Sequence, residues 1–163
     1  MKKAKRGVIM DDRQFRNAMG KFATGVTVVA TEVAGDVHGM TANAFMSVSL
    51  NPKLVVISIA EKAQMLEKIK QSKKFSVNIL AADQQELSMI FAGQSKNQHE
   101  IVFDRLEGIP VLPGAIAQIA CEVSAEHVEG DHTLFIGKVV SINLEDSDPL
   151  IYFSGQYRLL AEE

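Results

Sequence analysis

Polar side chains gather in one stretch of an otherwise apolar region, from Gly39 to Leu50. This stretch contains no Asp, Glu, Lys or Arg, yet Thr41, Asn43 and Ser47 can all donate hydrogen bonds. The small residues between them would let a ligand approach the backbone N–H groups, which suits phosphate oxygens and other polar edges. The same residues are also typical of a strand that enters the core through a serine-rich turn. Residue types alone do not decide between a ligand-binding turn and a strand that enters the core.

Other reactive arrangements are missing from the sequence. It contains no Gly-x-Gly-x-x-Gly turn and no Gly-x-Ser-x-Gly elbow. The carboxylates are scattered, so no general acid and base pair can be nominated, and no catalytic residue is proposed. The histidines stand singly and without paired cysteines, which argues against a metal site; they are His38, His99, His127 and His132. If the chain is an enzyme, its reactive chemistry is therefore expected to belong to a bound cofactor.

Length and composition predict one globular domain. The chain has 163 residues and a formal net charge of -3, with acidic and basic residues mixed, which argues against nucleic-acid binding. The basic residues at 1–6 are followed by no long apolar run, so neither a signal peptide nor a membrane anchor is expected. We expect a tail at 1–9 and one domain at 10–163. The single cysteine, Cys121, has apolar neighbours and is expected to be a buried thiol in a cytoplasmic protein.

The first expected helix begins at Asp11 or Asp12 as N-cap and is stopped by Gly25. Apolar residues with helical spacing form one face of it: Phe15, Ala18, Met19 and Phe22. We expect this helix on the outside of the domain.

Two further helices are expected. One covers residues 63–72. The other begins at Asp83 as N-cap, with Glu86 at the capping-box position, and closes at Gly93. A polar surface loop is expected to follow at 94–104.

The remaining segments predict strands, at 26–31, from 37 onward, and at 54–59, 75–80, 115–126, 133–144 and 150–153. Turns are expected at 34–36 and 129–131. The continuous apolar run at 54–59 predicts a strand buried on both faces, whereas the alternation at 75–80 predicts a half-buried one. Many short strands and tight turns favour a mainly β domain, a closed antiparallel barrel without exposed edges, with a few flanking helices.

At family level, the segment 39–50 with its flanks, 22–29 and 51–55, resembles the short-chain flavin reductases of two-component aromatic monooxygenases. The resemblance continues through further ordered motifs, at 75–80, 87–88, 91–93, 130–137 and 148–157. Within that family the motifs most resemble those of the reductase component of phenol 2-hydroxylase. The reductase of 4-hydroxyphenylacetate 3-monooxygenase is a near relative.

The resemblance implies a flavin-binding, Greek-key-like split β-barrel, in a homodimer. It also implies oxidation of NADH and transfer of reduced flavin, FADH2 or FMNH2, to a separate oxygenase that hydroxylates an aromatic compound such as phenol or 4-hydroxyphenylacetate. FAD is favoured over FMN by the likeness to the phenol hydroxylase component, and the sequence leaves NADH versus NADPH open. Hydride would pass from nicotinamide C4 to flavin N5, so the protein's task is to stack the two rings and stabilise developing charge.

The family pattern also implies cofactor-binding residues. The segment that would wrap the flavin contributes Thr41, Ala42, Asn43, Ala44, Phe45, Ser47 and Val48. A strand end and the turn after it would lie near the phosphates and ribityl chain, and contribute Ser58, Ile59, Ala60, Lys62 and Met65. The end of the third helix would line the adenine side with Phe91, Ala92 and Gly93. For Lys62 a solvated surface position, and for Phe91 core packing, are equally good interpretations.

Two more residues come from turns near the implied flavin site. His132 lies in a Gly-Asp-His-Thr turn and is the expected nicotinamide contact, although a lone histidine is otherwise typical of a turn residue bonded to backbone. Tyr157 follows Gly155, where a ligand can come close and an aromatic ring can cover it. Packing at the barrel rim is the alternative for Tyr157.

Two other functions stay open because a fold does not determine an activity. One is a non-catalytic flavin-binding or haem-binding split barrel. The other is an oxidase resembling the pyridoxamine phosphate oxidases, which would want basic residues around a substrate phosphate, and the segment 39–50 supplies none.

Overall fold

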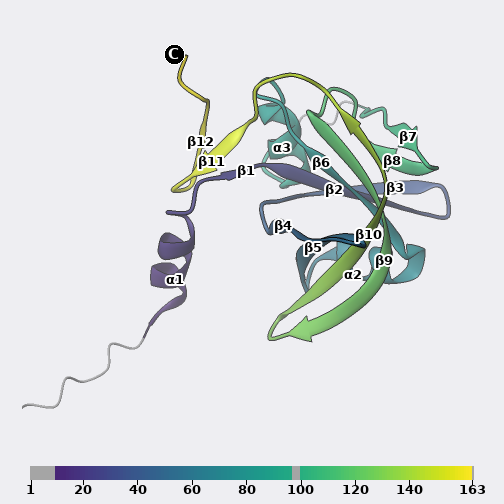
Figure 1. Cartoon of the computed structure of the whole chain (residues 1–163). Coiled ribbons are helices and arrows are strands. Elements are labelled where there is room, and N and C mark those ends of the chain that lie inside the picture. Colours follow the sequence, from purple (N-terminus) through teal and green to yellow (C-terminus); the bar gives the residue numbers. More distant parts are fainter. Residues whose placement is uncertain (1–9, 97–99, 163) are drawn as a thin grey trace, which may run out of the picture.

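The computed structural model describes residues 10–96 and 100–162, so the tail expected at 1–9 lies outside the described residues. Figure 1 shows a mainly β protein with a few helices at its periphery, as predicted. The helices are α1 (Asp12–Met19), α2 (Gln64–Ser72) and α3 (Gln85–Phe91). The strands are β1 (Thr24–Gly25), β2 (Thr27–Val33), β3 (Asp36–Ala42), β4 (Phe45–Leu50), β5 (Lys53–Ala60), β6 (Lys74–Ile79), β7 (Asp104–Leu106), β8 (Ile109–Val111), β9 (Ala117–Glu129), β10 (His132–Leu144), β11 (Ile151–Phe153) and β12 (Gln156–Arg158).

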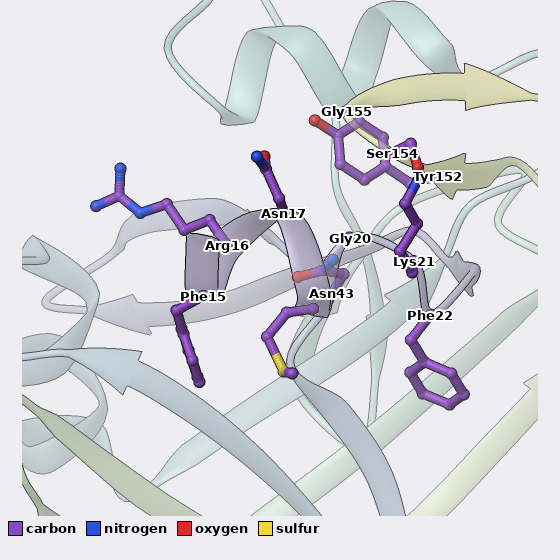
Figure 2. Close-up of a pocket in the computed structure, with 11 residues that line it drawn as sticks. Phe15, Arg16, Asn17, Gly20, Lys21, Phe22, Asn43, Tyr152, Ser154 and Gly155 are labelled. Atoms are coloured by element: carbon purple, nitrogen blue, oxygen red, sulfur yellow. The ribbon is translucent and has the colours of Figure 1, made fainter. Parts of the chain in front are cut away.

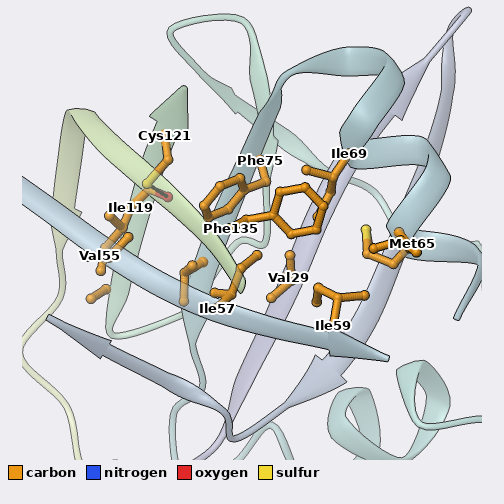
Figure 3. Close-up of a cluster of buried hydrophobic side chains, with 13 residues drawn as sticks. Val29, Val55, Ile57, Ile59, Met65, Ile69, Phe75, Ile119, Cys121 and Phe135 are labelled. Carbon is orange, nitrogen blue, oxygen red and sulfur yellow. Dashed lines mark hydrogen bonds between the residues drawn. The ribbon is translucent and has the colours of Figure 1, made fainter. Parts of the chain in front are cut away.

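One curled sheet forms the body of the molecule. Its seven strands pair in antiparallel fashion in the order β3-β2-β6-β9-β10-β5-β4. Buried side chains of the five inner strands meet in one core around Phe75 and Phe135 (Figure 3), and half-buried residues of the edge strands β3 and β4 pack against it. Helix α2 packs on the same core through Met65, Leu66 and Ile69. The sheet therefore encloses its core as a barrel does.

The barrel is open between β3 and β4, the two edge strands of the sheet. Within the described part of the chain these edges share no strand pairing, and only Asn43 and Ala44 connect them. The expectation of a fully closed barrel without edges is wrong on this point. The segment 39–50 is mostly strand, as one of the two interpretations held, and its turn is confined to two residues.

A second, three-stranded sheet in the order β1-β11-β12 lies beside the barrel. It brings the C-terminal hairpin against the start of the chain, with Thr24 opposite Tyr152. A small separate core joins this sheet to the rest of the molecule, and its buried members are Val26, Val28, Leu80, Leu112 and Leu150. A third, two-stranded sheet is the hairpin β7-β8, which the sequence did not predict.

Helix α1 begins as predicted but ends earlier. Asp11 is its N-cap and accepts a hydrogen bond of 2.6 Å from the Gln14 amide. The helix ends at Met19, and the amides that follow bond only three residues back, from Lys21 to the Ala18 carbonyl and from Phe22 to the Met19 carbonyl. Gly25, the expected stop, lies in β1 instead. No residue of α1 is buried, and Figure 1 shows the helix projecting away from the barrel.

Two strand predictions were reversed by tertiary packing. Strand β5 alternates between buried and half-buried residues, so only one of its faces is inside. Strand β6 is buried on both faces from Phe75 to Asn78, because the segment that contains β8 covers its outer side. The covered polar residues bond to that segment: Ser76 Oγ donates to the Pro110 carbonyl, and Asn78 Oδ1 accepts from the Leu112 amide.

Helix α3 also differs in its start. Its N-cap is Gln84 rather than Asp83, and Gln84 makes no side-chain bond to the helix amides. Its side chain turns back, accepts from the Ala81 amide and donates to the Pro113 carbonyl. Helix α2 matches its predicted bounds closely, from Gln64 to Ser72. No helix among the described residues is long and apolar enough to cross a membrane.

Candidate functional site

A cavity of about 180 Å³ lies where the end of β3, the end of α3 and the C-terminal hairpin meet. Its lining is mostly neutral and polar or aromatic, and consists of Val26, Thr41, Ala42, Asn43, Ser88, Ala92, Gln94, Tyr152 and Tyr157. Five of these residues were predicted from the sequence: Thr41, Ala42, Asn43, Ala92 and Tyr157. The fold thus brings together residues from three distant parts of the chain.

Hydroxyl groups tie the walls of this cavity together. Thr41 Oγ1 donates to the Ser88 carbonyl at 2.6 Å, which fixes the end of β3 against α3. The Ser88 hydroxyl and the Tyr157 phenol lie 2.7 Å apart and share a hydrogen bond. The Tyr157 ring also meets the edge of the Tyr152 ring, with centroids 5.4 Å apart. Three elements therefore hold the polar wall in place.

The end of α3 contributes unequally to the cavity. Ala92 lines it, whereas Phe91 packs on Phe103, with ring centroids 6.0 Å apart, and belongs to the smaller core. The structure therefore gives Phe91 the packing position that was its alternative interpretation. Gly93 follows with a φ of 72°, a left-handed conformation that glycine adopts without strain.

A second group of predicted residues lies along the ends of β5 and β10. The Ser58 amide donates to the Ala44 carbonyl at 3.2 Å, which joins the barrel opening to β5. Ala60 pairs directly with His132 across the sheet. Lys62 is exposed in the turn after β5. The turn connecting β3 to β4 thus links this group to the cavity.

His132 has a carboxylate partner at the barrel rim. Its Nδ1 lies 2.8 Å from Asp131 Oδ1, and its side chain is 44% exposed. The hydrogen bond and charge of His132 hold the pKa of Asp131 below its ordinary value, and the positive charge of Lys62 acts in the same direction. The imidazole is thereby oriented while much of its ring faces outward.

A larger cavity, of about 560 Å³, adjoins the first through Asn43 and Tyr152, which line both. Figure 2 shows α1 on one side of it, with Arg16 and Asn17, and the C-terminal hairpin on the other, with Ser154 and Gly155. Its remaining lining residues are Phe15, Met19, Gly20, Lys21 and Phe22. Gly155, a predicted site residue, has a φ of 76° in the turn of the hairpin.

Other predicted residues lie on β4 or inside the core. Ser47 and Val48 are exposed on the edge strand β4, and Phe45 is half-buried against the main core. Ile59 and Met65 are completely buried in that core. The structure therefore does not bring Ile59 and Met65 to a surface that a ligand can reach.

Four cavity residues were not predicted, namely Val26, Ser88, Gln94 and Tyr152. A signal existed for Ser88, because a serine four residues from Gln84 and from Ala92 shares their face of the helix. Val26, Gln94 and Tyr152 reach the cavity through the packing of the small sheet and the loop after α3, which no local pattern encodes.

The donor set fits a flavin nucleotide. Thr41, Asn43 and Gln94 offer neutral donors and acceptors suited to the edge of a heteroaromatic ring or to a ribityl chain. Tyr152 and Tyr157 present aromatic surface. Two cations that can pair with phosphates, Arg16 and Lys21, line the larger cavity, and Lys62 is exposed in the turn after β5.

Comparisons with known proteins agree with this chemistry. The flavin reductase like domain model matches residues 19–161. An NADH-dependent flavin reductase from a Rhodococcus species is 45% identical over 148 residues, 89% of this chain and 84% of that protein. The 4-hydroxyphenylacetate 3-monooxygenase reductase component of Thermus thermophilus is 37% identical over 90% of this chain and 95% of that protein.

A solved structure shares the same fold. The flavin reductase PheA2 in its native state is 64% identical and superposes with a TM-score of 0.92, over 94% of this chain and 100% of that chain.

Proposed function

The chain belongs to the flavin reductase like domain family, and we propose that it is an NADH-dependent flavin reductase that uses the cavity beside Thr41 and Tyr157. The enzyme class follows from the named relatives, which are NADH-dependent flavin reductases or reductase components of monooxygenases. The observation that carries the proposal for the site is the ring of neutral polar and aromatic side chains around the cavity. FAD is the flavin we favour, with FMN as the alternative.

The chain's own residues would bind and orient rather than transfer protons. When bound, the flavin would accept the hydride that NADH donates. Thr41 and Asn43, at the barrel opening, would hold the polar edge of the ring system. The exposed face of His132, oriented by Asp131, would receive the nicotinamide. Arg16, Lys21 and Lys62 are candidates for the phosphates.

Anaerobic NADH oxidation tests this proposal. Purified protein is mixed with NADH and with FAD, FMN or riboflavin in turn, and the absorbance of NADH and of oxidised flavin is followed. Flavin-dependent NADH oxidation is expected, with NADPH as the comparison reductant. Flavin binding without NADH oxidation would instead favour the non-catalytic binding module.

A homodimer is the assembly we propose, because the chain leaves much apolar surface uncovered. Phe15 and Met19 of α1 are 51% and 57% exposed, and Leu50 of β4 is 86% exposed. Met46 and Val48 of β4 are exposed too. An amphipathic helix projecting from its own barrel is stabilised when its apolar face packs on another surface.

Sedimentation or light scattering checks the assembly. A dimer mass is expected for the unaltered protein, and Met46→Glu with Val48→Glu should shift it to the monomer. Asp12→Lys, on the exposed helix α1 but outside its apolar face, is the control for a charge change elsewhere on the surface. A monomer at all concentrations would overturn the dimer.

We also propose that the reduced flavin goes to a separate oxygenase acting on an aromatic compound such as phenol or 4-hydroxyphenylacetate. Support comes from the Thermus relative, which is named as a reductase component of a monooxygenase.

The single buried cysteine agrees with a cytoplasmic setting. The match to residues 19–161 supports one domain at 10–163.

A further inference from the structure

Ser88 is the one buried residue of helix α3 and is completely enclosed. Its two oxygen atoms bond to different walls of the 180 Å³ cavity. The hydroxyl is 2.7 Å from the Tyr157 phenol, and the carbonyl accepts from Thr41 Oγ1 at 2.6 Å. Both partners are residues at which we propose flavin contact.

We propose that Ser88 is a positioning residue for the flavin, because its hydroxyl holds the Tyr157 ring as one wall of the binding cavity. This inference rests on the proposed flavin reductase function. Ser88 lies inside helix α3 and would set the width of the cavity, which is the separation between the end of β3 and the C-terminal hairpin.

The hairpin that carries Tyr157 lies outside the main sheet, and its turn is tied to the end of α1 by the Ser154 amide, which donates to the Gly20 carbonyl. In the described chain, β11 and β12 pair only with each other and with β1, outside the seven-stranded sheet. An isolated bridge between Ala81 and Pro149 precedes them. The Tyr157 ring packs against the smaller core and the Tyr152 ring, and its phenol is held by the hydrogen bond with the Ser88 hydroxyl.

A side-chain substitution separates the two roles of Ser88. Ser88→Ala removes the bond to Tyr157 but keeps the carbonyl that accepts from Thr41 and from the Ala92 amide. The end of β3 and the helix turn stay held, whereas the phenol loses its anchor. A buried neutral hydrogen bond of this kind changes an equilibrium by about fivefold to tenfold.

The test compares Ser88→Ala, Tyr157→Phe and the double variant. Each single variant is expected to raise KM for flavin about fivefold, and the flavin dissociation constant with it. Their kcat and KM for NADH should stay within about twofold. The double variant should match either single one, because both remove the same bond. Unchanged flavin affinity in the single variants, or additive effects in the double variant, would overturn the proposal.

A second hydroxyl pair in the molecule provides the control. Thr31 Oγ1 and Ser72 Oγ are also 2.7 Å apart, but neither lines the cavity. Ser72→Ala should lower the unfolding midpoint without moving KM for flavin. If Ser88→Ala does only the same, its role is structural. An unaltered protein that does not oxidise NADH would refute the proposed function instead, and flavin titration of the variants would still decide the role of Ser88.

Discussion

The ring of Phe91 fills the space in front of Gly39, where an added Cβ would lie 2.5 Å from its Cε1 atom. Residue 39 opens the polar segment that ends β3, and residue 91 ends α3 beside the cavity. The absence of a side chain at Gly39 therefore allows α3 to approach β3 closely enough for Thr41 to reach Ser88.

Gly39→Ala is expected to destabilise the protein by about 1–3 kcal/mol, because the methyl group overpacks against the Phe91 ring. Urea unfolding measures the loss, and flavin titration should show weaker binding. Gly25→Ala is the control, since an added Cβ there meets nothing within 4 Å. Adding Phe91→Leu to Gly39→Ala should recover part of the stability. No recovery would contradict the contact as the cause.

His132→Ala is expected to raise KM for NADH about threefold to tenfold, the loss of one ring-stacking contact, with a smaller effect on flavin affinity. Steady-state kinetics at saturating flavin gives the first value, and flavin titration the second. His127→Ala is the matched control, because His127 is an exposed histidine on the neighbouring strand β9, opposite Leu134. An unchanged KM for NADH would remove His132 from the nicotinamide site.

The same His132→Ala variant should raise the pKa of Asp131 toward its ordinary value, because the hydrogen bond that lowers it is gone. Because the Asp131 pKa is lower in the folded protein than in the unfolded chain, this carboxylate stabilises the fold at pH values above its ordinary pKa. That stabilisation is lost as the pH falls through the pKa of the folded protein. Carboxylate NMR during acid titration measures the shift. The Asp131 curve should not move in His127→Ala.

Cys121 should be unreactive in the native protein. Burial raises its pKa to about 12, so the thiolate is scarce at pH 8, and the side chain is inaccessible. A chromogenic disulfide reagent should label one thiol in guanidinium and none in buffer. Rapid labelling of the folded protein would show that this part of the core opens.

Features fixed by neighbouring residues could be predicted from the sequence. Asp11 caps a helix locally and was one of the two N-caps considered, and Gly130 lies, with a φ of 61°, at the turn predicted between two long strands. The burial of β6 was not, because it depends on the β8 segment that packs over Ser76 and Asn78. Helical spacing places Ser88 on the same face as Ala92, but its hydroxyl partner could not be predicted, since only the returning hairpin supplies it.

For the candidate site, the family resemblance predicted residues that lie at the barrel opening. It could not predict which of the other candidate residues are buried in the core. Ile59 and Met65 belong to segments that approach the site, yet their side chains face the core. For Ile59 the alternation along β5 decides this, because buried and half-buried residues alternate in the run at 54–59. Met65 is buried because it lies on the face of α2 that packs on the core.

The pairing of β5 with β10 places Ala60 opposite His132 and Ile57 opposite Phe135. These partners are far apart along the chain, so they meet only after several loops have closed, and such topologies fold slowly compared with helical proteins. The barrel rim at His132 is complete only when β5 has paired with β10. Recovery of NADH-dependent flavin reduction during refolding should therefore follow formation of the whole barrel, whereas helix signals would appear earlier.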